Sequence, residues 1–293
     1  MSIHVGTAPD SWGVWFANDA RQTPWQRFLD EVAAAGYDTI ELGPYGYLPT
    51  EPPVLAHELA QRSLAVAGGT LSGDLATPDG WAAMRERTAG VCDLLVHLNA
   101  HSVVVLDRGY FDANGQLSGP RELDDAGWAG LRENLHRLGE YTAARDIMAV
   151  FHPHADTTVQ FEPQIERLLA LTDPALVNLC LDVGHHAYPG GDPVAFFRQH
   201  HARVTYLHLK DVDATLAQRA READWPFGRA VEAGAFVDLG QGSVDFAGLN
   251  QVAHEVGYRG WGIVEQDMYP APFDKPLPIA QRNRDFLRRC GIG

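Results

Sequence analysis

The sequence predicts a (β/α)8 barrel, because short apolar segments alternate with longer helical patterns eight times along the 293 residues. Alternating strands and helices are typical of a parallel sheet covered by helices, and eight such units in about 250 residues or more fit a closed barrel. A doubly wound sheet is the competing fold, but the segment after the first strand, GTAPDSWG, lacks the GxGxxG pattern of a phosphate-binding loop. No linker or low-complexity stretch divides the chain, so we expect one domain over residues 1–293.

The expected strands are short and apolar, and several are rich in β-branched residues. They are Ile3–Ala8, Tyr37–Leu42, Leu64–Gly69, Ser102–Leu106, Ile147–His152, Val177–Asp182, Arg203–Leu209 and Gly260–Gln266. A helical pattern follows each strand. The expected helices are Pro24–Ala35, Pro53–Arg62, Pro78–Ala100, Asp124–Arg145, Pro163–Leu171, Pro193–His200, Phe246–Val256 and Pro278–Arg289. Thr23 is the expected N-cap of the first helix, Gly36 lies just past its end, and Val212–Ser243 is expected to be an irregular insert that contains a helix.

The composition is acidic, which excludes polyanionic partners. The chain has 38 Asp and Glu against 23 Lys and Arg, a formal charge of −15. A protein that neutralises phosphates needs a basic surface, so we expect neither a nucleic-acid partner nor an anionic membrane surface. No signal peptide or long apolar span is visible in the sequence, and the three cysteines cannot all pair with one another. We therefore expect a cytoplasmic protein with reduced thiols.

Titratable side chains gather at the carboxyl ends of the expected strands, where the active site of a barrel lies. In chain order these residues are Glu41, His152, His154, Asp182, His185, His208, Lys210, Glu265 and Asp267. Side chains two residues apart on a strand share a face, so His152 and His154 point the same way, as do His208 and Lys210. Imidazole and carboxylate together suit a divalent transition metal, so we expect a metal or catalytic site at this end of the barrel.

Several residues near the expected site have alternative interpretations. Glu41 is a metal ligand, a substrate contact or a salt-bridge partner. Trp12, Trp15 and Phe16, after the first strand, either form an apolar wall for a substrate or pack the top of the barrel. Cys180 lies in an apolar strand two residues before Asp182 and is expected to fill the core.

Several segments, in chain order, resemble a known superfamily. They are GTAPDSWG, FHPHADTTVQ, TDPALVNLCLDVGHHAYPGGDP, VTYLHLKDV, AGAFVDLGQGSVDF and GWGIVEQD. This set resembles the xylose-isomerase-like barrel superfamily of sugar isomerases, epimerases and endonuclease-IV-type enzymes, and within it the inosose dehydratases. The resemblance implies four metal ligands, one from each of strands five to eight. At the matching positions these are His152, Asp182, His208 and Glu265, with His152 standing where the isomerases and epimerases carry a glutamate. His154 is close enough to be the alternative fifth-strand ligand.

The resemblance also implies an enzyme that acts on a keto-cyclitol or keto-sugar through an enediolate, with a divalent metal (Mn or Co, or else Zn, Fe or Mg). Dehydration is the expected outcome, as when 2-keto-myo-inositol gives a trihydroxycyclohexanedione. His154 is the first candidate for the base, with Glu265 as the second. Lys210 and His185 are candidates to protonate or hold a hydroxyl, and Glu41 and Trp12 are candidate substrate contacts.

Two alternatives accompany this expectation. Reprotonation of the same enediolate would give an isomerase or epimerase, of the ketose 3-epimerase or hydroxypyruvate-isomerase type. A non-catalytic or endonuclease-IV-like member is the third hypothesis, and the charge of −15 argues against DNA as its substrate. We allow for a homo-oligomer, since barrels of this type often associate.

Overall fold

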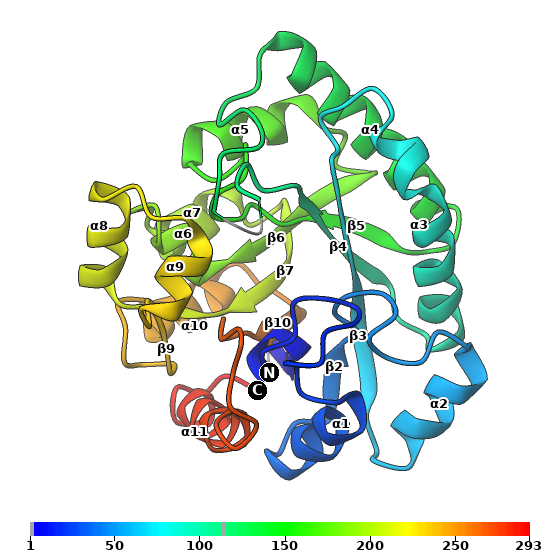
Figure 1. The fold of residues 1–293 in the computed structure, drawn as a ribbon, viewed down its shortest axis with the longest axis vertical. Helices are drawn as coiled ribbons and strands as arrows, with labels where there is room; N and C mark the ends of the chain where they lie inside the picture. Colours follow the sequence, from blue (N-terminus) through cyan, green and yellow to red (C-terminus); the bar gives the residue numbers. More distant parts are fainter. Residues whose placement is uncertain (1–2, 113–114) are drawn as a thin grey trace.

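A computed structural model describes residues 3–112 and 115–293 and shows the expected closed barrel of parallel strands (Figure 1). Around the barrel the strands follow the order β1-β10-β7-β6-β5-β4-β3-β2. Their bounds are Ile3–Thr7 (β1), Thr39–Glu41 (β2), Ala65–Gly73 (β3), Ser102–Asp107 (β4), Met148–Phe151 (β5), Val177–Asp182 (β6), Val204–Leu209 (β7) and Gly260–Val264 (β10). Every expected strand is present, with ends shifted by a few residues.

The helices that follow these strands cover the outside of the barrel (Figure 1). Their bounds are Trp25–Ala34 (α1), Pro52–Ala60 (α2), Gly80–His97 (α3), Asp125–Ala143 (α4), Glu162–Leu171 (α5), Pro193–His200 (α7), Phe246–Glu255 (α10) and Pro276–Arg289 (α11). None of the helices in the described part of the chain combines the length and the hydropathy that a bilayer-spanning segment requires.

The start of α1 differs from the expectation. Pro24, not Thr23, occupies the N-cap position, and no side chain caps this end. The hydroxyl of Thr23 instead donates to the carbonyl of Trp12 at 2.9 Å, which ties the loop after β1 to the start of α1. Gly36 does lie just past the helix with a φ of +83°, a left-handed conformation that glycine adopts without strain.

Two regions contain elements that the sequence did not indicate individually. A 3-10 turn, η1 (Pro9–Trp12), follows β1, and a short helix, α6 (Val183–Ala187), follows β6. The expected insert contains two helices and an antiparallel pair of short strands. These elements are β8 (Asp211–Val212), α8 (Ala214–Glu222), α9 (Phe227–Glu232) and β9 (Phe236–Val237). They pack on a small apolar cluster of their own beside the barrel mouth, which includes Ala155 and Tyr188.

Alternation along the strands separates an apolar barrel interior from a polar mouth. In β6, Asn178, Cys180 and Asp182 share one face of the strand, and Cys180 belongs to the small apolar cluster that fills the barrel interior. The β6–β7 register pairs Asp182 with His208, and the β7–β10 register pairs Leu209 with Val264, one residue before Glu265. Parallel pairing therefore brings the polar strand ends to one level.

Asp211, at the end of the LHLKD motif, holds the loop before α10 in place. It is fully buried, and its two carboxylate oxygens accept hydrogen bonds from the backbone N–H groups of Gly240, Gly242, Val212 and Val244 at 2.8–3.0 Å. A Cβ on Gly242 would lie 2.3 Å from Asp211 Oδ1, so the approach requires glycine there. The carboxylate thus fixes the GQGSVDF segment against the insert.

We expect Asp211→Ala to lower the free energy of unfolding by about 2–4 kcal/mol, because it leaves the buried N–H groups of Val212 and Val244 without an acceptor. Urea unfolding followed by circular dichroism measures the loss. Asp30→Ala is the control: the side chain of Asp30 is 63% exposed and pairs with Arg62, so its loss is expected to cost less than about 1 kcal/mol. Equal stability of the two variants would contradict the role given to Asp211.

A second prediction concerns Asp107, which ends β4 and accepts hydrogen bonds from Leu75 N–H and the Thr158 hydroxyl. Burial raises its pKa from 3.8 to about 6, so the folded protein retains this proton where the unfolded chain has lost it. Because the carboxyl pKa is raised in the folded state, the free energy of unfolding falls as the pH rises from about 4 to 6. It stays at the lower value above that range. Across this range the wild type is expected to lose about 2–3 kcal/mol relative to Asp107→Asn, measured by urea unfolding at each pH. A stability difference that does not change with pH would contradict this assignment.

Candidate active site

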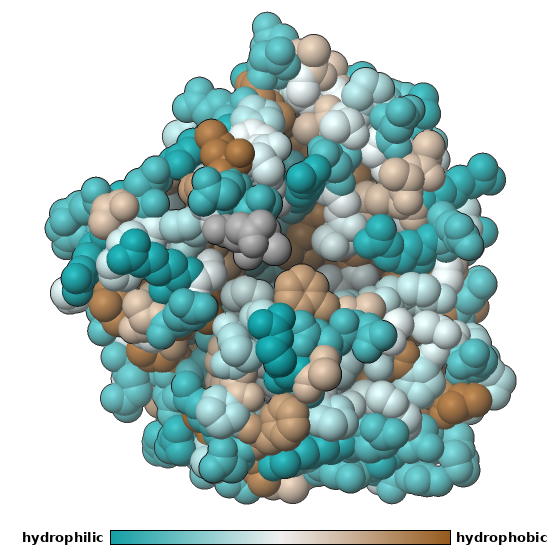
Figure 2. Space-filling model, in the orientation of Figure 1, coloured by the Kyte–Doolittle hydropathy of each residue, from teal (hydrophilic) through white to brown (hydrophobic). Residues whose placement is uncertain are grey.

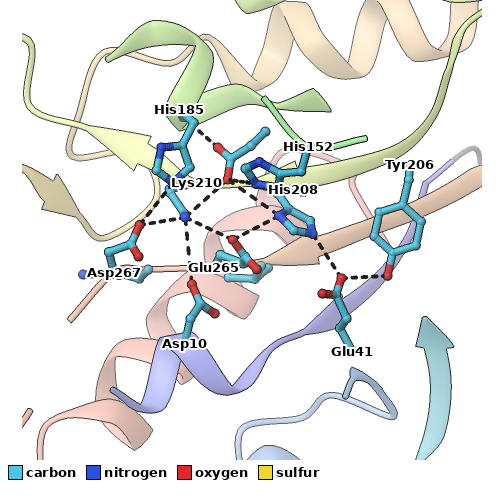
Figure 3. A network of polar contacts seen from close by, with 12 residues as sticks. Asp10, Glu41, His152, His185, Tyr206, His208, Lys210, Glu265 and Asp267 are labelled. Carbon is cyan, nitrogen blue, oxygen red and sulfur yellow. Dashed lines mark hydrogen bonds and ion pairs between the residues drawn. The ribbon is translucent and has the colours of Figure 1, made fainter. Parts of the chain in front are cut away.

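Four side chains from neighbouring strands converge at the barrel mouth (Figure 3). His152 follows β5, Asp182 ends β6, His208 lies in β7 and Glu265 follows β10. One nitrogen or oxygen atom from each lies within 4.8 Å of the others, and all four residues are buried. His208 Nδ1 lies 3.0 Å from Glu265 Oε2, and His152 Nε2 lies 3.4 Å from Asp182 Oδ2. These are the four positions that the resemblance implies as ligands, and the structure brings them together.

The donor atoms of this cluster fit a divalent metal. Among the described residues, His208 Nδ1 and Asp182 Oδ2 are buried without a hydrogen-bond partner. Leaving such atoms unsatisfied costs about 1–3 kcal/mol each, and a bound cation would satisfy both. Two imidazoles with two carboxylates are the ligand chemistry of Mn, Fe, Co and Zn. His154, the alternative expected from sequence, is not part of the four-residue cluster.

Glu41 contacts His208 from behind rather than joining the cluster. Its Oε2 lies 3.1 Å from His208 Nε2 and accepts a hydrogen bond from the Tyr206 hydroxyl, while its Oε1 accepts one from Thr70. A carboxylate that holds one ring nitrogen of a histidine fixes the tautomer and frees the other nitrogen for a metal. Here the free nitrogen is Nδ1, which faces Glu265. Glu41 also lines the cavity, so its expected substrate contact stays a prediction.

Lys210 is buried in the middle of the carboxylates (Figure 3). Its Nζ lies 2.7 Å from Asp267, 3.0 Å from Glu265, 3.3 Å from Asp182 and 3.9 Å from Asp10. Burial acts to lower the pKa of Lys210, but attraction by Asp182, Asp267 and Glu265 raises it well above its ordinary value. The side chain is therefore a permanent cation that lines the cavity.

His154 is a neutral imidazole beside the metal cluster. Burial, together with the nearby His185 and His152, lowers its pKa well below the ordinary value. His154 Nδ1 lies 2.7 Å from the carbonyl of Ala155 and donates to it, which leaves Nε2 as the unprotonated nitrogen. Because His154 lines the cavity, this nitrogen is available to accept a proton there.

His185 lies behind His154, and their ring centroids are 3.8 Å apart. Its Nδ1 accepts from Ala155 N–H, and its Nε2 lies 3.6 Å from Asp267 Oδ2. Burial and the charge of Lys210 lower its pKa. His185 is absent from the residues that line the cavity, so the structure places it as a support for His154 and Asp267 rather than at the substrate.

The cluster opens into a cavity of about 990 Å³, which joins an outer chamber of about 1060 Å³. Figure 2 shows a hollow near the centre of this face of the molecule. Trp15 and Phe227 line both spaces and stack at 5.8 Å, and Trp15 also stacks on Tyr269 at 5.0 Å. This aromatic wall joins the loop after β1 to the helix α9 of the insert.

The structure places the side chain of Trp12 away from the position of the substrate contact that was one of the two expectations for it. Trp12 is fully buried, its Nε1 donates to Glu31 at 2.9 Å, and its ring packs edge-on against Phe28. The second interpretation from sequence, packing at the top of the barrel, therefore describes Trp12. Trp15, three residues later, is the tryptophan that lines the cavity.

Asp10 is a cavity residue that sequence reasoning missed. It lies in η1 directly after β1 and lines the same cavity as His152, His208 and Glu265. The sequence did contain a signal for Asp10. This residue lies at the carboxyl end of the first strand, and the other candidates lie at the carboxyl ends of their own strands.

Comparison with known proteins gives consistent results. Residues 29–290 match the family model described as "Xylose isomerase-like TIM barrel". An inosose dehydratase of Lacticaseibacillus casei is 32% identical over 98% of this chain and 97% of its own, and one of Geobacillus thermodenitrificans is 30% identical over 99% and 98%. Among solved structures, IOLI with a bound zinc atom shares the fold with a TM-score of 0.72 at 15% identity, covering 97% of this chain and 98% of its own. The probable 3-DHS dehydratase AsbF from Bacillus anthracis shares it with a TM-score of 0.71 at 14% identity, covering 98% of both chains.

These relatives confirm the expectation of an enzyme of the lyase or isomerase kind. The family match covers most of the chain, and the strands follow the order of a closed barrel. The chain belongs to the xylose isomerase-like TIM barrel family.

Proposed function

We propose that this protein is a divalent-metal-dependent dehydratase that acts on a keto-cyclitol or a similar keto-sugar. The observation that carries the proposal is the cluster of His152, Asp182, His208 and Glu265 in one cavity with the neutral base His154. The similarity to proteins named inosose dehydratase over nearly their whole length supports the choice of reaction.

The four cluster residues are the ones that would hold the metal. A divalent ion bound there supplies a Lewis acid, which polarises a carbonyl and an adjacent hydroxyl. Glu41 would orient the ligand His208, since it holds the other nitrogen of that ring.

His154 is the proposed base. The carbon next to a ketone carries an acidic proton, and an unprotonated imidazole can remove it at neutral pH. His154 meets this requirement because its Nδ1–H is tied to Ala155 and its Nε2 is free. The permanent charge of Lys210 then stabilises negative charge that develops on the substrate oxygens.

The same first step could end in reprotonation, which would make the enzyme an isomerase or epimerase. An enzyme that moves a proton between two faces of a carbon needs a base on one side and an acid on the other. In the epimerases of this superfamily two glutamates form that pair. Here Glu265 is the only glutamate in the four-residue cluster, because His152 occupies the other position. The paired glutamates of those epimerases are therefore not present in this cluster.

The proposal predicts that the protein with Mn or Co converts inosose to a product with the ultraviolet absorbance of the dione. His154→Gln is expected to lose both this conversion and exchange of the α-proton into deuterated water by at least about 100-fold, because both need the base. His57→Gln, on the exposed side of α2, is the control and is expected to keep both. Proton exchange without any dione from the wild type would instead indicate an isomerase or epimerase.

The metal site is tested without an activity assay. After treatment with a chelator, the wild type is expected to bind one equivalent of Mn or Co in a calorimetric titration and to melt at a higher temperature when loaded. Glu41→Gln should weaken binding by about 10–100-fold, as expected for a residue that orients a ligand, and His208→Ala should weaken it more. Unchanged binding in His208→Ala would remove this cluster as the metal site.

A further inference from the structure

Asp10 lies at the cavity with one carboxyl oxygen that accepts no hydrogen bond from any described residue. Its Oδ1 accepts a hydrogen bond from Ser11 N–H at 2.7 Å, which fixes the side chain. Its Oδ2 is buried and has no hydrogen-bond partner among the described residues, and its ion pair with Lys210 Nζ is long, at 3.9 Å. Because Asp10 lines the cavity, this side chain lies beside the space that a substrate would occupy.

Asp10 is also the carboxyl group least neutralised by the lysine at the centre of the site. Lys210 Nζ lies within 3.3 Å of Asp267, Glu265 and Asp182 but 3.9 Å from Asp10 (Figure 3). Burial and repulsion by Glu265 raise the pKa of Asp10 well above its ordinary value, whereas the pKa of Asp267 is lowered. Among these carboxyl groups, Asp10 is therefore the one whose protonated form its surroundings favour most.

The strand order places Asp10 across the barrel from the proposed base. In the closed order β1-β10-β7-β6-β5-β4-β3-β2, the strands β1 and β5 stand four positions apart and face each other. Asp10 follows β1 and His154 follows β5. A cyclic substrate in the cavity can therefore contact the base on one side and a carboxyl group on the other.

The two residues expected from sequence to supply the leaving-group proton are less suited to it. Lys210 directs its ammonium group at three carboxylates, which already bind its N–H groups. His185 does not line the cavity. Neither objection applies to Asp10.

We propose that Asp10 is the catalytic acid that protonates the departing hydroxyl. The inference rests on the proposed dehydration. His154 takes the proton from the α-carbon, and the electron pair of that C–H bond forms the enediolate. As the carbonyl re-forms, the pair becomes the double bond between the α- and β-carbons and the bond from the β-carbon to oxygen breaks. The oxygen takes the proton of Asp10 and leaves as water. No oxidation occurs, and proton transfer through solvent returns His154 and Asp10 to their starting forms.

The test compares Asp10→Asn with the wild type, both loaded with Mn, on two substrates. The first is inosose, and the second is its analogue with fluorine in place of the departing hydroxyl, since fluoride leaves without prior protonation. We expect the variant to lose water elimination by on the order of 100-fold, while α-proton exchange and fluoride elimination stay near the wild-type rates. Asparagine keeps the acceptor for Ser11 N–H, so the variant is expected to fold normally.

Asp30→Asn, an exposed position in α1, is the matched control and is expected to match the wild type in every assay. Full water elimination by Asp10→Asn would overturn the role of Asp10, as would an equal loss of exchange, fluoride elimination and water elimination. If the wild type eliminates neither water nor fluoride, the proposed function itself fails and the role of Asp10 fails with it. The wild-type assays therefore distinguish failure of the function from failure of this inference.

Discussion

The excess of negative charge at the barrel mouth is the constraint on which the rest of the site depends. Five carboxyl groups converge there: Asp10, Glu41, Asp182, Glu265 and Asp267. Among the described residues, Lys210 is the only lysine or arginine that contacts them. Buried charge that is not balanced is costly, so such a mouth favours further cations. The raised pKa of His208 reflects the same demand: burial acts against the proton, but the neighbouring carboxylates of Glu265 and Glu41 favour it. A divalent ion would meet this demand more fully than a proton.

Parallel strand pairing explains why these charges meet at all. Each side chain follows or ends a strand, and the register sets Asp182 beside His208 at one level of the barrel. Below this level the inward-facing residues are apolar and include Cys180, whose buried thiol has a pKa raised to about 12. The apolar floor excludes water and strengthens every electrostatic interaction above it. The charged mouth and the apolar interior therefore both follow from which residues along the paired strands face inward.

Much of the fold, and the convergence of titratable side chains at one end of the barrel, could be predicted from the sequence, because both depend on strand ends. A run such as SVVVL identifies its own strand, and residues two apart share a face whatever surrounds them. The features that could not be predicted depend on where each side chain points in the folded protein. Trp12 and Trp15 lie three residues apart in one loop, yet only the second lines the cavity. The contact of Glu41 with His208 joins residues 167 positions apart. Thr23 has the residue type of an N-cap, but the N-cap position falls on Pro24 and the Thr23 hydroxyl donates to the carbonyl of Trp12.

The closed strand order also places the proposed base and the proposed acid on opposite walls of the mouth. The four cluster residues lie at the ends of β5, β6, β7 and β10, which are consecutive in the barrel, while Asp10 follows β1, which pairs with β10 and stands opposite β5. His154 shares the β5 wall with His152 of the four-residue cluster, so the proposed base lies beside the side chains that would hold a metal. In the proposed reaction, the leaving group on the neighbouring carbon faces the wall that carries Asp10. Trp15 and Phe227 line the space between these walls. Aromatic rings there offer an apolar face to the C–H bonds of a flat ring substrate. A cyclic ketone spans these features better than an open chain, since its carbons hold fixed directions toward both walls.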